Sequence, residues 1–171
     1  AMDYINANAH PNVKLKAISN IYYPGFNADN VNSSCRDSAT GQTVNMRTTF
    51  LPVLARMNYW MCEYARQKGF RCVDSFAQYM AADTDTNGDG LIDAEAIRYV
   101  AGESEAAYVN KITVTYRSTL RDANTKFVTA SSSFDYIQSD DVHPTFTGGT
   151  VSAGLFGGTT SSGAPRYTTG Q

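Results

Sequence analysis

The region between residues 50 and 74 constrains the fold more than any other part of the sequence. Apolar residues recur there at spacings of three and four: Phe50, Val53, Leu54, Met57, Trp60, Met61, Tyr64 and Ala65. This periodicity predicts a helix with one apolar stripe that faces a core. Thr48 or Thr49 can cap the helix, Pro52 is tolerated in its first turn, and Gly69 ends it. The five residues 70–74 then predict a short buried strand.

A second strand is predicted upstream of this helix. Residues 13–23 alternate between polar and apolar side chains, become apolar, and stop at Pro24-Gly25. Strand, long helix and strand make a βαβ unit, which implies a parallel sheet with helices on its faces. Residues 26–44 are polar and rich in Asn, Ser and Gly, so we expect a long loop, of the kind that often lies over a binding cleft.

Shorter elements are predicted after the second strand. Residues 75–82 favour a short helix, and a further helix is expected from Asp93 to Ala101, ended by Gly102. Ser104 can cap another helix, whose β-branched run at 112–115 lowers its helical propensity. The apolar positions of that helix include Ala107, Tyr108, Ile112, Tyr116 and Leu120. Short extended pieces are expected at 127–128 and 134–137, and one short helix at 151–156 within a segment rich in Gly, Ser and Thr.

Composition bounds the class of protein. The chain has 171 residues, of which 42% are hydrophobic, so it can build the core of a single domain. Its net charge of -2 comes without any long basic cluster, which argues against nucleic-acid binding. The apolar runs are far shorter than a membrane-spanning helix needs.

Three cysteines leave one without a partner within this chain. Cys62 lies about two helical turns before the corner at Gly69, and Cys72 lies three residues after it. Both are therefore roughly 9–10 Å from the corner and can lie side by side. We expect a Cys62–Cys72 disulfide and a secreted or periplasmic protein, with a pair of buried thiols as the alternative. Cys35 would then be free or bonded to another chain.

An acidic segment from Asp83 to Glu95 has the spacing of a calcium-binding loop. Read from Asp85, oxygen ligands fall at positions 1, 3, 5, 7 and 9, namely Asp85, Asn87, Asp89, the carbonyl of Leu91, and Asp93. Gly90 falls at position 6, where the loop turns sharply. Position 12 is Ala96, and Glu95 comes one residue too early. A register from Asp83 is the alternative and puts Gly88 at position 6. The segment therefore predicts a structural Ca²⁺ site, or else a solvated acidic turn that caps the following helix.

A carboxylate and an imidazole stand three residues apart in Asp140-Asp-Val-His143-Pro144. A carboxylate bonded to one ring nitrogen orients the imidazole and leaves the other nitrogen to act as a general base. The same spacing also occurs in turns without function. Its place late in an α/β pattern favours catalysis, because such folds put their sites at the carboxyl ends of strands.

At Asp140, His143 and Pro144 the sequence resembles the SGNH (GDSL-type) hydrolase family, whose last conserved block is Asp-X-X-His-Pro. The strand ending in Ser19-Asn-Ile-Tyr-Tyr-Pro-Gly25, the variable loop and the long helix are also similar to the second half of such enzymes. The resemblance implies a flavodoxin-like three-layer α/β/α sandwich that hydrolyses esters. His143 would be the general base and Asp140 its orienting partner, with Asp141 a solvated neighbour.

The family's Gly-Asp-Ser nucleophile block and its oxyanion blocks are missing from this chain. Ser131–Ser133 and Ser161–Ser162 do not lie on a strand-turn-helix elbow, so we interpret them as loop hydroxyls. The chain is therefore expected to be the carboxyl-terminal part of a carboxylic ester hydrolase, with residues 1–146 and 147–171 in one domain. An N-terminal segment would supply the serine and the oxyanion donors for a small ester substrate. The alternative is a non-catalytic calcium-binding interaction module.

Overall fold

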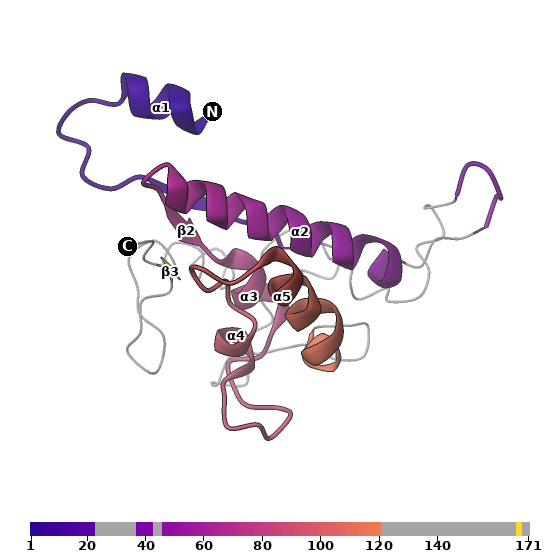
Figure 1. The fold of residues 1–171 in the computed structure, drawn as a ribbon. Helices are drawn as coiled ribbons and strands as arrows, with labels where there is room; N and C mark the ends of the chain where they lie inside the picture. Colours follow the sequence, from indigo (N-terminus) through magenta and orange to yellow (C-terminus); the bar gives the residue numbers. More distant parts are fainter. Residues whose placement is uncertain (23–36, 43–45, 121–166, 169–171) are drawn as a thin grey trace, which may run out of the picture.

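The structure, a computed structural model, describes residues 1–22, 37–42, 46–120 and 167–168. Two short strands, β1 (Ala17–Ser19) and β2 (Arg71–Val73), pair in parallel, with Ile18 opposite Cys72. The long helix α2 (Met46–Gln67) connects them, as Figure 1 shows. The predicted βαβ unit is thus present, although β1 is much shorter than the expected strand at 13–23.

A third strand, β3 (Tyr167–Thr168), pairs antiparallel with β2 and gives the sheet order β1-β2-β3. The Gly-, Ser- and Thr-rich composition of residues 147–171 gave no signal for this strand. The predicted pieces at 127–128, 134–137 and 151–156 lie outside the described residues, as does the expected loop at 26–44 except for residues 37–42.

Helix α2 begins earlier than its predicted cap at Thr48 or Thr49. Its first residue is Met46, so Pro52 is the seventh residue of the helix and not part of its first turn. Proline lacks the N–H that would bond to the carbonyl four residues earlier, yet the helix continues through it. The other end is as predicted, since Gly69 has a positive φ of 73° and the chain turns there into β2.

The apolar stripe predicted to face the core is divided between two sides of α2. Leu54 and Ala65 are buried, together with Leu51, Ala55, Tyr59 and Cys62. Phe50, Val53, Met57, Trp60 and Tyr64 are exposed. The prediction of a single core-facing stripe is therefore wrong, because α2 carries apolar side chains on two faces.

The N-terminal helix α1 (Met2–Asn8) was not predicted, and it lies beside the end of α2 (Figure 1). Asp3 forms an ion pair with Lys68 at 2.6 Å and accepts a hydrogen bond from the Tyr64 hydroxyl. Met2 is buried and belongs to the core cluster. Polar side chains on most of its seven residues hide this helix in a search for apolar periodicity.

Short helices follow β2 below α2. Helix α3 (Ser75–Met80) is capped by Asp74, and α4 (Asp93–Ala96) ends five residues before the predicted end at Ala101. The chain leaves α4 after Ala96, and the Tyr99 amide then donates to the Asp74 carboxylate at 2.9 Å. The buried carboxylate thus competes with continuation of the helix.

The predicted helix after Ser104 is present as three pieces. These are α5 (Glu105–Asn110), the π-helical turn η1 (Lys111–Thr115) and the 3₁₀ turn η2 (Arg117–Thr119). The Ser104 side chain accepts from the Ala107 amide, as its capping role predicts, but Ala107 itself is exposed. Tyr108, Ile112 and Leu120 are buried as expected.

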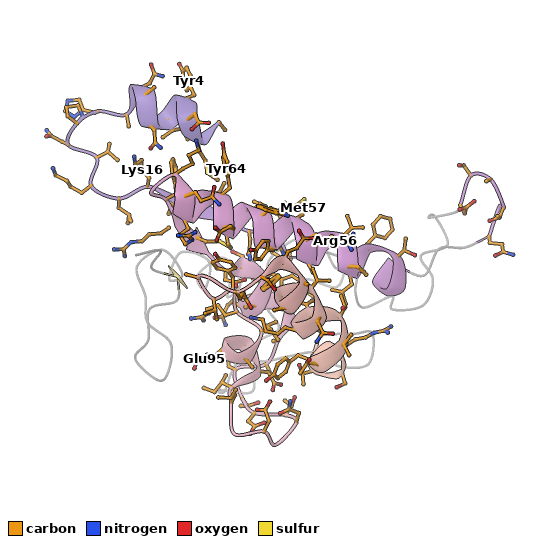
Figure 2. The ribbon with its side chains drawn as sticks, viewed as in Figure 1. Tyr4, Lys16, Arg56, Met57, Tyr64 and Glu95 are labelled. Atoms are coloured by element: carbon orange, nitrogen blue, oxygen red, sulfur yellow. A yellow bond between two sulfur atoms is a disulfide. The ribbon has the colours of Figure 1, made fainter. Side chains whose placement is uncertain are left out.

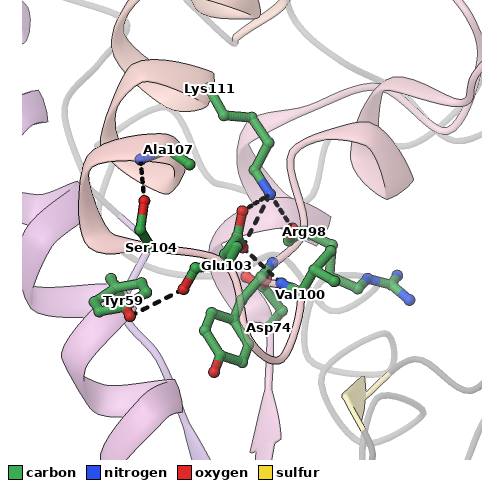
Figure 3. Close-up of polar contacts among 9 residues, drawn as sticks. Tyr59, Asp74, Arg98, Val100, Glu103, Ser104, Ala107 and Lys111 are labelled. Carbon is green, nitrogen blue, oxygen red and sulfur yellow. Dashed lines mark hydrogen bonds and ion pairs between the residues drawn. The ribbon is translucent and has the colours of Figure 1, made fainter.

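The turn that precedes α5 is held by a lysine, as Figure 3 shows. Lys111 forms an ion pair with Glu103 at 2.8 Å and donates to the carbonyl of Arg98 at 2.6 Å. The Tyr59 hydroxyl donates to the carbonyl of Glu103, which connects α2 to the same turn. The segment between α4 and α5 is therefore fixed at several points.

The predicted disulfide is confirmed, because Cys62 of α2 is bonded to Cys72 of β2 across a Cα–Cα distance of 5.0 Å. Both residues are buried. Cys35 lies outside the described residues.

Candidate functional site

Polar side chains gather where the two parallel strands end. Asn20 follows β1 and Asp74 follows β2, and the Asn20 amide donates to Asp74 Oδ1 at 2.7 Å. The hydroxyls of Ser19 and Ser75 lie 2.6 Å apart. This is the sheet edge at which parallel α/β folds place their sites.

The Asp74 carboxylate at this edge is buried and fully used by the fold. Oδ1 accepts from Asn20 and from the amide of Ala77, and Oδ2 accepts from the amide of Tyr99. Asn20 in turn accepts from the amide of Phe76. These bonds fix both strand ends, the start of α3 and the Tyr99 segment. We therefore assign this network a positioning role, because each oxygen of Asp74 already accepts backbone or amide donors.

This network was missed by the sequence analysis, although a signal for it exists. Asp74-Ser75 ends the second predicted strand, and Ser19-Asn20 is a polar pair inside the first, predicted at 13–23, where the observed β1 already ends. Since the carboxyl ends of parallel strands meet at one edge, the two dipeptides are expected to be neighbours.

The acidic segment forms a compact turn whose hydrogen bonds follow the register from Asp85. Asp85 accepts from the amide of Gly90 at 2.9 Å and from the amide of Gly88 at 2.6 Å. Asn87 accepts from the amide of Asp89, and Asp89 accepts from the amide of Leu91. Gly90 has a φ of 87°, the left-handed conformation that favours glycine at the sharp turn.

The remaining acidic residues of the segment have other partners. Asp83 accepts from the side chain of Gln78 at 2.9 Å, outside the turn. Asp93 is buried and accepts from the amide and the hydroxyl of Thr86. Glu95 lies in the first turn of α4 and is half-buried. Among the predicted ligands, Asp85, Asn87, Asp89 and Leu91 thus share one turn, while Asp93 closes its base.

The Tyr116 hydroxyl lies close to the carboxylates of the acidic turn. The Tyr116 hydroxyl is hydrogen-bonded to Asp89, and this bond is the largest cause of the raised pKa of Tyr116. Burial raises that pKa further, followed by the negative charges of Asp89, Asp93 and Asp85. The pKa of Asp89 is lowered, first by the Leu91 amide and next by the Asn87 side chain. Three carboxylates therefore act on a single hydroxyl next to η1.

The turn fits a cation in part. Its oxygen donors are of the kind that Ca²⁺ prefers, and its backbone already has the sharp bend at position 6. Within the part of the chain that the structure describes, however, no group of three or more His, Cys, Asp or Glu side chains converges closely enough to hold a metal ion. Position 12 is Ala96, which has no ligating side chain.

Asp140 and His143 lie outside the described residues, and so do Asp141, Pro144 and the serines at 131–133 and 161–162.

Comparison of the chain with protein-family models, with curated proteins and with solved structures gave no match. Across residues 1–22, 37–42 and 46–120, no helix combines the length and the apolarity needed to cross a membrane.

Proposed function

We propose that this chain is the carboxyl-terminal part of a secreted ester hydrolase of the SGNH type, stabilised by calcium at its acidic turn. The observation that carries the hydrolase proposal is the Asp140-X-X-His143-Pro144 block, which follows a parallel βαβ unit along the chain. The polar carboxyl edge of β1 and β2 and the Cys62–Cys72 disulfide support the proposal.

The proposed reaction is acyl transfer to water. A serine from an N-terminal segment attacks the ester carbonyl while His143 accepts its proton, and amides of that segment stabilise the oxyanion. His143 then protonates the leaving alcohol, and an acyl-enzyme remains. Water, deprotonated by His143, releases the acid and restores the serine. Asp140 holds the imidazole in the required tautomer throughout.

A His143→Ala variant of the complete protein tests this role. We expect hydrolysis of p-nitrophenyl esters to fall about 1,000-fold or more, because the serine loses its general base. His10, the other histidine of the chain, is exposed in a turn and gives the matched control His10→Ala, which should keep full activity. Unchanged turnover in a folded His143→Ala protein would instead favour the non-catalytic calcium-binding module.

The calcium proposal is carried by the hydrogen-bond pattern of the turn. The Asp85–Gly90, Asn87–Asp89 and Asp89–Leu91 bonds set the oxygens at positions 1, 3 and 5 around the bend. Closely spaced carboxylates repel one another until a hard cation neutralises them. Calcium would therefore stabilise the turn between α3 and α4, which lies far along the chain from His143.

Calorimetric titration with Ca²⁺ tests this proposal, with terbium luminescence as a second readout. We expect saturable binding and a higher melting temperature with Ca²⁺ than with chelator. Asp85→Asn should weaken binding about tenfold or more, since it removes the charge at position 1. Asp37→Asn is the matched control, because Asp37 also accepts backbone amides in an exposed turn.

Tyr116 should sensitise terbium bound beside Asp89, so that Tyr116→Phe lowers the luminescence while the heat of calcium binding remains. Absence of binding heat together with a melting temperature that ignores chelator would contradict the calcium proposal.

A further inference from the structure

The exposed face of α2 lacks the charges that a helix in contact with water normally carries. Val53 is 60% exposed and Trp60 is 51% exposed, and Met57 and Tyr64 lie on the same face. Figure 2 shows Arg56, Met57 and Tyr64 along α2. Among the exposed residues between positions 50 and 64, Arg56 is the one charged side chain, and it is paired with Glu105 at 3.4 Å. We call Val53, Met57, Trp60 and Tyr64 the α2 seam.

The α2 seam has the spacing of a helix-packing surface. Steps of four, three and four residues are those of the apolar positions in a coiled coil. A helix that is apolar on two opposite sides is usually covered on both of them. The buried side of α2 packs on the sheet and on α5, whereas the seam is exposed in the part of the chain that the structure describes.

A pocket in the α2 seam has the form of a coiled-coil hole. It measures about 350 Å³ and is lined by Met57, Trp60, Met61 and Tyr64, with Met2 of α1 at its side. Those four residues of α2 stand at i, i+3, i+4 and i+7, the arrangement that receives one apolar side chain from a facing helix.

Val53 is the complementary knob on the same helix. It lies about two turns before the centre of the pocket, so an antiparallel copy of α2 turned about an axis at Met57 brings Val53 over the partner's pocket. The same operation brings the partner's Val53 over the first pocket. We propose that two copies of this chain associate through the α2 seam, with Val53 of each copy inserted between Met57, Trp60, Met61 and Tyr64 of the other.

The exposed area of the α2 seam and the charge beside it suit weak pairing with a second copy of the chain. The exposed parts of the seam side chains amount to roughly 400 Å² per copy, so the pair covers roughly 800 Å², the size of a weak, transient contact. A weak, reversible dimer that forms at high chain concentration is therefore expected. Arg56 lies next to Met57, near the proposed two-fold axis, and is paired with Glu105. The Arg56 side chains of the two copies therefore do not face each other as unpaired cations.

A lipid surface fits the seam less well. Carboxylates lie at both of its edges, because the Trp60 ring nitrogen donates to Glu105 at 2.9 Å and the Tyr64 hydroxyl donates to Asp3 at 3.2 Å. Each of these carboxylates is paired with a cation, Glu105 with Arg56 and Asp3 with Lys68, so the edges of the seam offer anionic lipid no net positive charge.

Sedimentation velocity of the 171-residue chain, from micromolar to submillimolar concentration, tests the proposal. We expect a concentration-dependent shift from one to two chains. Trp60 is the sole tryptophan, so its emission should move to shorter wavelength over the same range. Val53→Asp should weaken association about tenfold or more. Val114→Asp, at a valine of η1 that is 67% exposed, is the matched control and should dimerise as the parent chain does.

A cysteine variant tests contact between the two copies independently of how stable the dimer is. Met57→Cys in a Cys35→Ser background should form a disulfide between copies across the axis, whereas Val114→Cys should not. A chain that stays monomeric throughout overturns the proposal, as does a dimer that Val53→Asp leaves intact. A monomer whose Trp60 emission shifts with phosphatidylglycerol vesicles overturns it too and assigns the seam to lipid.

Discussion

Glu63 is the one acidic residue of α2, and its pKa is strongly lowered. It lies in a nearly buried position and accepts from Arg66 through both of its oxygens, at 2.6 and 3.0 Å. Tyr99 and Gln67 also donate to it. The paired hydrogen bonds of Arg66 are the largest cause of the lowered pKa of Glu63, which falls from 4.5 to about 2. Tyr99 adds to this effect, and burial opposes it.

This lowered pKa predicts a specific dependence of stability on pH. The folded-state pKa lies below the unfolded value, so the contribution of Glu63 is complete above pH 4.5 and is lost as the pH falls towards 2. Glu63→Gln should reduce the free energy of unfolding at neutral pH by about 2 kcal/mol. It should also flatten the loss of stability over this acid range.

Urea unfolding at a series of pH values between neutrality and 2 measures both effects. Glu95→Gln serves as the control, since Glu95 lies on a different helix and is more exposed. Parallel pH profiles for the parent chain and for Glu63→Gln would show that the Arg66 pair does not contribute.

At the residue scale the sequence allowed correct prediction of the cap at Ser104, the helix stop at Gly69 and the disulfide, but not of the start of α2 or of buried polar partners. Ser104 and Gly69 act locally, so their roles follow from a few neighbouring residues. Asp74 binds groups that come from β1, α3 and the segment at Tyr99. Such a network depends on tertiary structure, which spacing along the chain does not contain.

At the scale of elements, α2 shows why periodicity alone assigned the wrong inner face. The positions 53, 57, 60 and 64 and the positions 51, 55, 59 and 62 both repeat at helical spacing. Two overlapping stripes of this kind cannot be ranked from hydrophobicity, and the sheet contacts decide which is buried. The β-branched run at 112–115, whose helical propensity is low, lies in the π-helical turn η1, a change of helix type that the sequence analysis did not predict.

The disulfide that links α2 to β2 gives a prediction about the stability of this pair of elements. The Cys62–Cys72 disulfide closes a loop of 10 residues, for which chain entropy gives a stabilisation of about 3 kcal/mol. The double variant Cys62→Ala/Cys72→Ala should lower the melting temperature accordingly, as measured by differential scanning calorimetry. Cys35→Ser, which leaves this bridge in place, should not. Equal melting temperatures for all three proteins would show that the bridge contributes nothing.

At the scale of the whole molecule, β1 and β2 form a parallel pair that α2 connects, an arrangement typical of the α/β class. The three-layer sandwich is a proposal. The sequence predicted the order strand, helix, strand because each element has a strong local pattern and Gly69 marks the corner. It did not predict α1 or β3, whose short and polar sequences are ordered by contact with the rest of the chain.

The acidic turn and the predicted catalytic block differ in how far apart along the chain their partners lie. The turn is a local motif, and its register from Asp85 is visible in backbone hydrogen bonds within six residues. A triad needs groups from distant parts of a fold, so the Asp140–His143 spacing predicts only two of its members.

Labelling of the native protein with a fluorophosphonate, followed by mass-spectrometric mapping, tests the hydrolase proposal most directly. Such reagents react with serines whose hydroxyl is activated by a neighbouring base. We predict one labelled serine, located outside these 171 residues, and labelling about 1,000-fold slower after His143→Ala. Absence of any labelled serine, or labelling that is unaffected by the loss of His143, would contradict the proposal.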